Sequence, residues 1–186
     1  MQKNKHMKTK NLLLVFLLAF SIFSCKNNKT ENAPTEPVKE DKNFKVTIEL
    51  IAKKEDNMHL YFTEDKSINF TEEKSVWVPI KGSEQAQQVV FNLPEDAIPT
   101  DLRIDFGGGV NKEQKELVLK NFKMEYFDKT FEVKNAVIFN YFYPNKDNTI
   151  LDIENATLRR VKEDQIMAPS LYPHKALQEE LIKMTR

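Results

Sequence analysis

Four side chains in the middle of the chain combine the residue types that bind ligands with both apolar and polar surfaces. Tyr61 and Trp77 provide flat aromatic rings, and Arg103 and Asp105 provide charged hydrogen-bonding groups. Sugars present apolar C–H faces that suit aromatic rings and hydroxyls that suit charged groups. These four are the candidate ligand-binding residues. The alternative is structural, with the aromatic rings packed under the C-terminal tail.

Alternating strands are the elements that would position these side chains. Apolar residues alternate with polar or aromatic ones in three segments that contain them: 58–62, 76–80 and 102–106. Successive side chains of a strand point to opposite faces of a sheet. The two rings, and the Arg103–Asp105 pair, therefore fall opposite the apolar positions of their strands and are expected to face outward.

The same period of two recurs along most of the chain after residue 43. Further alternating or short apolar segments are 44–50, 89–93, 117–119, 124–126, 131–133 and 137–143. Turn residues separate them at intervals of about ten residues, which is typical of an antiparallel sandwich or barrel. The pattern predicts an all-β, antiparallel β-sandwich of jelly-roll-like type over residues 44–155. Tyr141 and Tyr143 share the parity of apolar neighbours and are expected in its core.

Residues 156–186 are expected to form a separate C-terminal tail. Near its end, apolar residues recur at helical spacing: Ala176, Leu177, Leu181, Ile182 and Met184. This stripe predicts a short helix, which is marginal alone and must dock on the sandwich or on a partner.

Other residue patterns do not converge on catalysis, a metal or a cofactor. The histidines after the leader, His59 and His174, are far apart, so they are expected as one surface residue on a strand and one in the tail. Glycines 107–109 precede another strand instead of a helix, which favours a hairpin or bulge over a phosphate loop. Asp105 and Glu125 have no spacing that singles them out as a glycosidase pair.

Cys25 is the only cysteine, and it follows a leader with the organisation of a secretory signal peptide. Four lysines precede the apolar stretch Asn11–Ser24, which is shorter than the roughly 20 residues of a transmembrane helix. We interpret residues 1–24 as a signal peptide. The alternatives are an uncleaved N-terminal anchor and a signal peptide whose cysteine is incidental.

Composition narrows the class of protein further. Without the four leader lysines, 24 basic residues face 28 acidic ones, a net charge near −4. A mildly acidic domain does not indicate nucleic-acid binding. Residues 25–43 are polar, contain prolines and lack periodicity, so they are expected to form a flexible tether.

The residues Ile22–Cys25 resemble the lipobox of bacterial lipoproteins. Val90–Pro94 and Leu102–Gly107 are similar to strand ends in β-sandwich modules that accompany glycan-handling proteins of the Bacteroidota. The resemblance implies a diacylglycerol on the sulfur of Cys25, removal of the leader, an envelope location and a jelly-roll module. It transfers no catalytic residue. Acidic residues that often mark surface export are absent from Lys26–Lys29, which favours an orientation toward the periplasm.

Two functions remain open at this stage. In the first, the sandwich is a non-catalytic binding or scaffolding module for a glycan or an envelope protein. In the second, the chain is a structural or assembly lipoprotein whose C-terminal helix contacts a partner. Both place the chain on a membrane through its lipid anchor, without a cofactor.

The anchor can be tested directly. We expect cells to incorporate labelled palmitate into the chain with Cys25 and not into the variant Cys25→Ser, because only the thiolate sulfur can form the thioether. Two acyl chains give stable membrane binding, so only the wild-type chain, with Cys25, should fractionate with membranes. Equal membrane association of both proteins, without label, would contradict lipidation.

Overall fold

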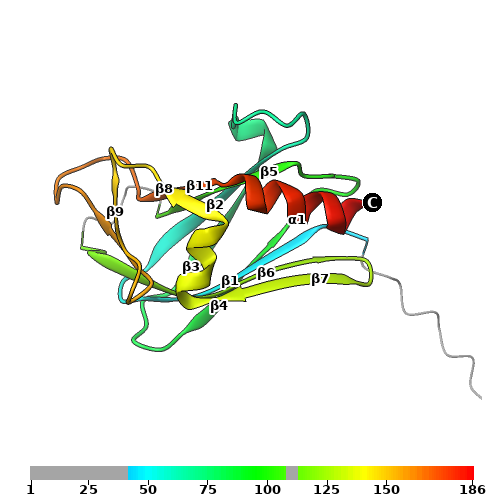
Figure 1. Ribbon diagram of the computed structural model, residues 1–186. Coiled ribbons are helices and arrows are strands. Elements are labelled where there is room, and N and C mark those ends of the chain that lie inside the picture. Colours follow the sequence, from blue (N-terminus) through cyan, green and yellow to red (C-terminus); the bar gives the residue numbers. More distant parts are fainter. Residues whose placement is uncertain (1–41, 108–112) are drawn as a thin grey trace, which may run out of the picture. The chain divides into compact units, whose positions relative to one another are not determined.

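The computed structural model describes residues 42–107 and 113–186. It consists mostly of antiparallel strands in two sheets, with one short C-terminal α-helix, which confirms the predicted all-β sandwich (Figure 1). The strands are β1 (Lys45–Ala52), β2 (Asp56–Thr63), β3 (Ser75–Ile80), β4 (Gln87–Asn92), β5 (Asp101–Phe106), β6 (Glu116–Tyr126), β7 (Lys129–Lys134), β8 (Phe142–Pro144), β9 (Thr149–Asp152), β10 (Thr157–Arg160) and β11 (Ser170–Pro173).

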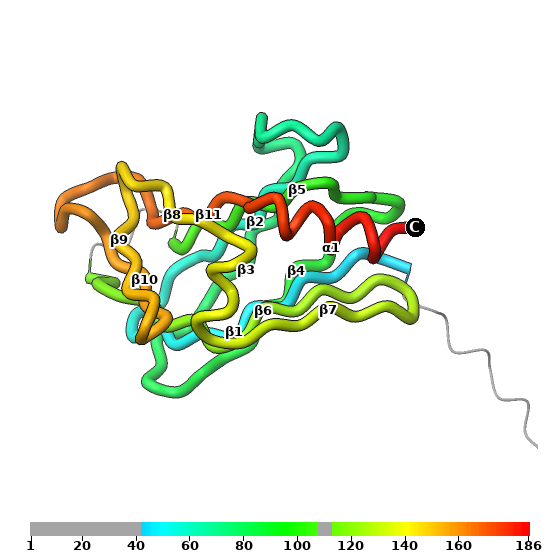
Figure 2. The backbone as a smooth tube through the Cα atoms, in the orientation of Figure 1, coloured from blue at the N-terminus to red at the C-terminus, as the bar shows by residue number. Residues whose placement is uncertain are grey.

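The two sheets have matching strand orders. Sheet A runs β4-β1-β6-β10-β9, with β7 also paired to β6, and sheet B runs β3-β2-β5-β11-β8. Consecutive strands along the chain therefore occupy the same place in opposite sheets: β1 and β2, β3 and β4, β5 and β6, β8 and β9, and β10 and β11. The smooth tube of Figure 2 can be followed in this way from β3 into β4. The sandwich therefore consists of five such pairs of consecutive strands, with one strand of each pair in either sheet, and β7 at the side of β6.

The connections within these pairs pack against one another. The N–H of Ser83, between β3 and β4, donates to the carbonyl of Ala52 at the end of β1 (2.7 Å). At Gly82 an added Cβ would lie 2.9 Å from the carbonyl oxygen of Lys53, so only glycine fits there without a shift. The side chain of Gln114, which precedes β6, accepts a hydrogen bond from the N–H of Lys54 (2.7 Å), which lies between β1 and β2.

The inner faces of the sheets form one apolar core. Its largest fully buried side chains are Phe44, Phe91, Phe106, Phe122, Phe142, Ile48, Leu50, Met58, Leu60, Leu93, Leu102 and Ile104. Each such side chain contributes about 1.5–3 kcal/mol through burial. The predicted alternation holds in β1, β2 and β5, where the inward positions are apolar.

Helix α1 (Lys175–Thr185) completes this core. Leu177, Leu181 and Met184 are buried, and the helix contacts β5 and β11 of sheet B and β6 and β7 of sheet A. Figure 1 shows α1, in red, beside strands of both sheets. The sequence left open whether the helix docks on the sandwich or on a partner. Its apolar stripe packs on the sandwich.

The segment 137–143 is not the strand that the alternation predicted. Asn135–Asn140 forms a 3-10 helix, and Asn135 at its start has a positive φ of 49°. Within the predicted segment, only its last residues belong to a strand, β8. Val137 is 49% exposed while Ile138 and Phe139 are buried, so neighbouring apolar residues, not alternate ones, meet the core. The expectation that Tyr143 is a core residue is also wrong, because its ring is exposed.

The expected boundary at residue 155 is wrong as well. β10 pairs with β6 and β9, and β11 pairs with β5 and β8, so both belong to the sandwich. These strands have four residues each and carry arginine or proline, which hides their period. Long-range pairing with β5 and β6 decides their structure instead.

The docking of α1 makes a stability prediction. The variant Leu181→Ala should lose about 2–5 kcal/mol of unfolding free energy, because it opens a cavity between the helix and both sheets. Glu179→Ala, at an exposed position of the same helix, should stay within about 0.5 kcal/mol of wild type. Urea unfolding followed by circular dichroism measures both. Equal effects of the two substitutions would contradict the burial of this face.

Candidate functional site

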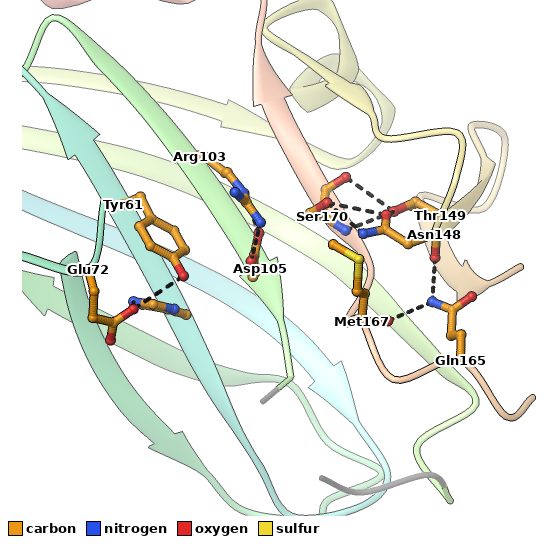
Figure 3. A network of polar contacts seen from close by, with 10 residues as sticks. Tyr61, Glu72, Arg103, Asp105, Asn148, Thr149, Gln165, Met167 and Ser170 are labelled. Carbon is orange, nitrogen blue, oxygen red and sulfur yellow. Dashed lines mark hydrogen bonds and ion pairs between the residues drawn. The ribbon is translucent and has the colours of Figure 1, made fainter. Parts of the chain in front are cut away.

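The outer face of sheet B brings the four candidate residues together. In the strand register, His59 of β2 stands opposite Trp77 of β3 and Asp105 of β5, and Tyr61 stands opposite Arg103. Because these positions share one parity, all five side chains lie on the face opposite the core. Figure 3 shows Tyr61, Arg103 and Asp105 on neighbouring strands of this face.

Three rings of this face form a compact stack. The rings of His59 and Trp77 are 3.6 Å apart at their centroids and inclined by 20°, and the Tyr61 ring is 3.8 Å from that of His59. His59 is only 1% exposed, whereas Trp77 is 47% exposed. The indole therefore covers the imidazole and keeps about half of its own surface in contact with solvent.

Glu72 joins the top of this stack. It lies in a short 3-10 helix, Glu72–Lys74, between β2 and β3. The indole Nε1–H of Trp77 donates to Oε1 of Glu72 (2.7 Å), and the hydroxyl of Tyr61 donates to Oε2 (3.4 Å). The carboxylate side chain is 64% exposed. It thus holds the indole in one orientation and still offers acceptor positions to solvent.

Arg103 and Asp105 form a closed ion pair. Nε and an Nη of Arg103 donate to the two carboxylate oxygens of Asp105 at 2.8 and 2.6 Å. The guanidinium also lies 4.9 Å from the ring centroids of Tyr61 and Tyr172, a cation–π arrangement. Burial raises the pKa of Asp105, although the hydrogen bond to Arg103 opposes this shift. The pair therefore braces the aromatic rings more than it faces solvent.

The aromatic surface extends beyond the stack. The ring centroid of Phe70 lies 6.4 Å from that of Tyr61 and 6.0 Å from that of Tyr172. The ring centroids of Tyr143 and Tyr172 are 5.9 Å apart. Phe70 and Glu72 belong to the connection between β2 and β3. In the structural alternative, the helix of the C-terminal tail covers the aromatic rings of this face. In the structure, Phe70 and Glu72 of the β2–β3 connection cover them in part.

The protonation states of the stack suit binding more than proton transfer. Burial lowers the pKa of His59 to about 4, with Arg103 adding to the shift and Glu72 opposing it. Burial, helped by Asp105 and Glu72, raises the pKa of Tyr61 to about 12. At neutral pH the imidazole is uncharged and enclosed, and the phenol keeps its proton.

A second polar cluster adjoins this face and is structural. The Asn148 side chain donates to the Ser170 hydroxyl (3.1 Å), the Ser170 N–H donates to the Thr149 hydroxyl (2.7 Å), and the Gln165 amide donates to the Asn148 carbonyl (2.7 Å). Ser170 pairs with Asp105 across β11 and β5, and it is fully buried (Figure 3). The cluster fastens β11 and the connection before it to the start of β9.

No group of three His, Cys, Asp or Glu side chains could hold a metal ion within residues 42–107 and 113–186. In that same part of the chain, none of the helices has the length and apolarity needed to cross a bilayer. Cys25 and the glycines that follow Gly107 lie outside the described residues.

Several residues of the site were missed by sequence reasoning. His59 was expected at the surface, and it is buried because Trp77 and Tyr61 cover both sides of its ring. The available signal was its position two residues before Tyr61, which places both side chains on the same face of β2. Glu72 and Tyr172 gave no signal, because the β2–β3 connection and β11 bring them to the site from other parts of the chain.

Comparison with protein-family models, with curated proteins and with solved structures finds no match. A proposal about function therefore depends on the residues described above.

The buried histidine makes a prediction about pH. An unfolded chain binds a proton at His59 near pH 6.5 and the folded protein only near pH 4, so stability falls as pH decreases between these values. From pH 7 to 4.5 this residue should cost the fold about 2 kcal/mol. The variant His59→Phe, which keeps an aromatic ring there, should lose that share of the pH dependence. Identical pH profiles in urea unfolding would contradict a depressed pKa.

Proposed function

We propose that this chain is a non-catalytic binding module of the bacterial cell envelope, whose ligand surface is the outer face of sheet B. A glycan is the proposed ligand, and an envelope protein is the other candidate. The observation that carries the proposal is the half-exposed indole of Trp77, held over His59 and oriented by Glu72.

An oriented indole is a suitable platform for a sugar ring. Because Trp77 is stacked at 3.6 Å on a buried ring and hydrogen-bonded at its nitrogen, little side-chain freedom remains to be lost on binding. The exposed Glu72 carboxylate lies next to it and can accept hydrogen bonds from hydroxyls. A ligand with an apolar C–H face and hydroxyls at its edge matches both groups.

The chemistry of the same residues favours binding over catalysis. A neutral, enclosed His59 has no access to a substrate proton, and a general base needs a pKa near the working pH. Arg103 and Asp105 spend their strongest hydrogen bonds on each other. These groups are suited to hold the surface rigid.

The proposed location follows from the leader. Residues 1–24 would be removed, Cys25 would carry the lipid, and residues 25–43 would form the tether of a periplasm-facing lipoprotein of Bacteroidota type. This part of the proposal depends on the basic start, the apolar stretch and the lone cysteine. The proposed role is local, since a tethered module searches for ligands close to its membrane.

In the assembly alternative the C-terminal helix contacts a partner, and the apolar stripe is the part of that helix best suited to such a contact. Leu177, Leu181 and Met184 are buried against the sandwich instead. Binding through the outer face of sheet B is therefore the better supported function.

Because Trp77 is the only tryptophan, its fluorescence reports the proposed site directly. Titration of the full chain in detergent with soluble plant, fungal and bacterial polysaccharides should give a saturable shift of its emission for at least one of them. Calorimetry with that polysaccharide should show that Trp77→Ala weakens binding about tenfold or more, because a central aromatic contact is lost.

Phe127→Ala is the matched control. Phe127 is an exposed aromatic residue in the turn between β6 and β7, away from sheet B, and its loss should leave affinity unchanged. An emission that does not change across the panel would contradict a glycan ligand. Equal losses in both variants would contradict this location of the site.

A further inference from the structure

The outer face of sheet A carries a depression that the aromatic site does not involve. Its volume is about 510 Å³. It is lined by residues of β1, β4, β6 and β7: Lys45, Thr47, Gln88, Val90, Asn92, Asn121, Lys123, Glu125 and Glu132. None of these is aromatic, and Val90 alone is apolar.

The strand register explains how these side chains gather. Two rows cross the four strands: Asn92, Lys45, Glu125 and Thr130 form one, and Val90, Thr47, Lys123 and Glu132 form the next. A third row places Gln88 and Asn121 on either side of Glu49. Because all rows share the outward parity of sheet A, the polar groups converge on one surface.

Asn121 is the most informative residue of the depression. It is only 8% exposed, and its Nδ2–H donates to Oε1 of Glu132 (2.7 Å). A carboxylate only accepts hydrogen bonds, so this contact fixes which end of the amide is the oxygen. Within the described residues, Oδ1 of Asn121 is buried without a hydrogen-bond partner. A buried acceptor without a donor is costly, and a ligand hydroxyl that reached it after a small shift of the side chains around it would remove that cost.

The charges of the lining select the class of ligand. Two ammonium groups, on Lys45 and Lys123, balance two carboxylates, on Glu125 and Glu132. Nζ of Lys123 already donates to Oε1 of Glu125 (2.8 Å). A charged ligand would therefore find as much repulsion as attraction. Amides and the Thr47 hydroxyl both donate and accept, which matches groups that also do both.

We propose that this depression is a second binding site, for a neutral polyhydroxylated ligand such as an oligosaccharide. It would recognise hydroxyls by hydrogen bonds alone, without ring stacking. It lies on the other sheet from Trp77 and shares no residue with the aromatic site, so either site can exist without the other.

The test uses side-chain amide signals. The full chain in detergent, labelled with ¹⁵N at Asn and Gln, is titrated with neutral hexasaccharides of glucose, xylose, mannose and N-acetylglucosamine up to about 10 mM. With one of these sugars we expect saturable shifts of the Asn121 and Gln88 NH₂ signals. The double variant Gln88→Ala/Asn92→Ala should weaken that binding about tenfold, because two exposed hydrogen-bonding groups are lost.

Two controls separate this site from the other. Gln85→Ala removes an exposed glutamine of the β3–β4 connection that does not line the depression, and it should leave the affinity unchanged. Trp77→Ala should leave the Asn121 shifts unchanged, even if it abolishes binding at sheet B. The proposal is overturned if no sugar shifts these signals, or if Trp77→Ala removes the shifts while Gln88→Ala/Asn92→Ala does not.

Discussion

The matched strand order of the two sheets, which places consecutive strands on opposite sides of one core, is the constraint on which the rest of this structure depends. Five pairs of consecutive strands share one order in both sheets, so both strands of each pair must turn their apolar parity toward a single core. The opposite parity is then left for the two outer faces. Those faces carry the aromatic stack of sheet B and the polar depression of sheet A. Gly82 allows the β3–β4 connection to approach Lys53, and Gln114 accepts a hydrogen bond from Lys54, so neighbouring connections lie close together.

The outer face of sheet B shows how burial and hydrogen bonding prepare a rigid surface. His59 is enclosed between two aromatic rings and stays neutral, because a charge there would lose its hydration. Its enclosure orders Trp77, whose nitrogen is held by Glu72. Arg103 supports the neighbouring rings while its own charge is matched by Asp105. The geometry of the parts that face solvent, the Trp77 indole and the Glu72 carboxylate, is therefore set by contacts within the protein.

Much of the fold could be predicted from alternation, and part of the site as well. The period of two placed Tyr61, Trp77, Arg103 and Asp105 on the outer parity of their strands, and the register brings them to one face. Alternation gave a wrong prediction for 137–143, because a 3-10 helix buries adjacent residues there and the alternate apolar residues do not share one face of a strand. It also missed β10 and β11, since strands of four residues are too short to show a period.

The amino-acid order was sufficient for the class of the fold and for the inward and outward parity of its longer strands. It also carries the pattern that predicts a leader over residues 1–24. These features depend on neighbours along the chain, and local chemistry specifies them. Which outward residues meet was decided by tertiary structure alone. Trp77 reaches Glu72 through a turn, Tyr172 reaches Arg103 through β11, and Asn121 reaches Glu132 through a hairpin. Such contacts depend on strand order and register, which arise from packing the whole core and not from any local segment.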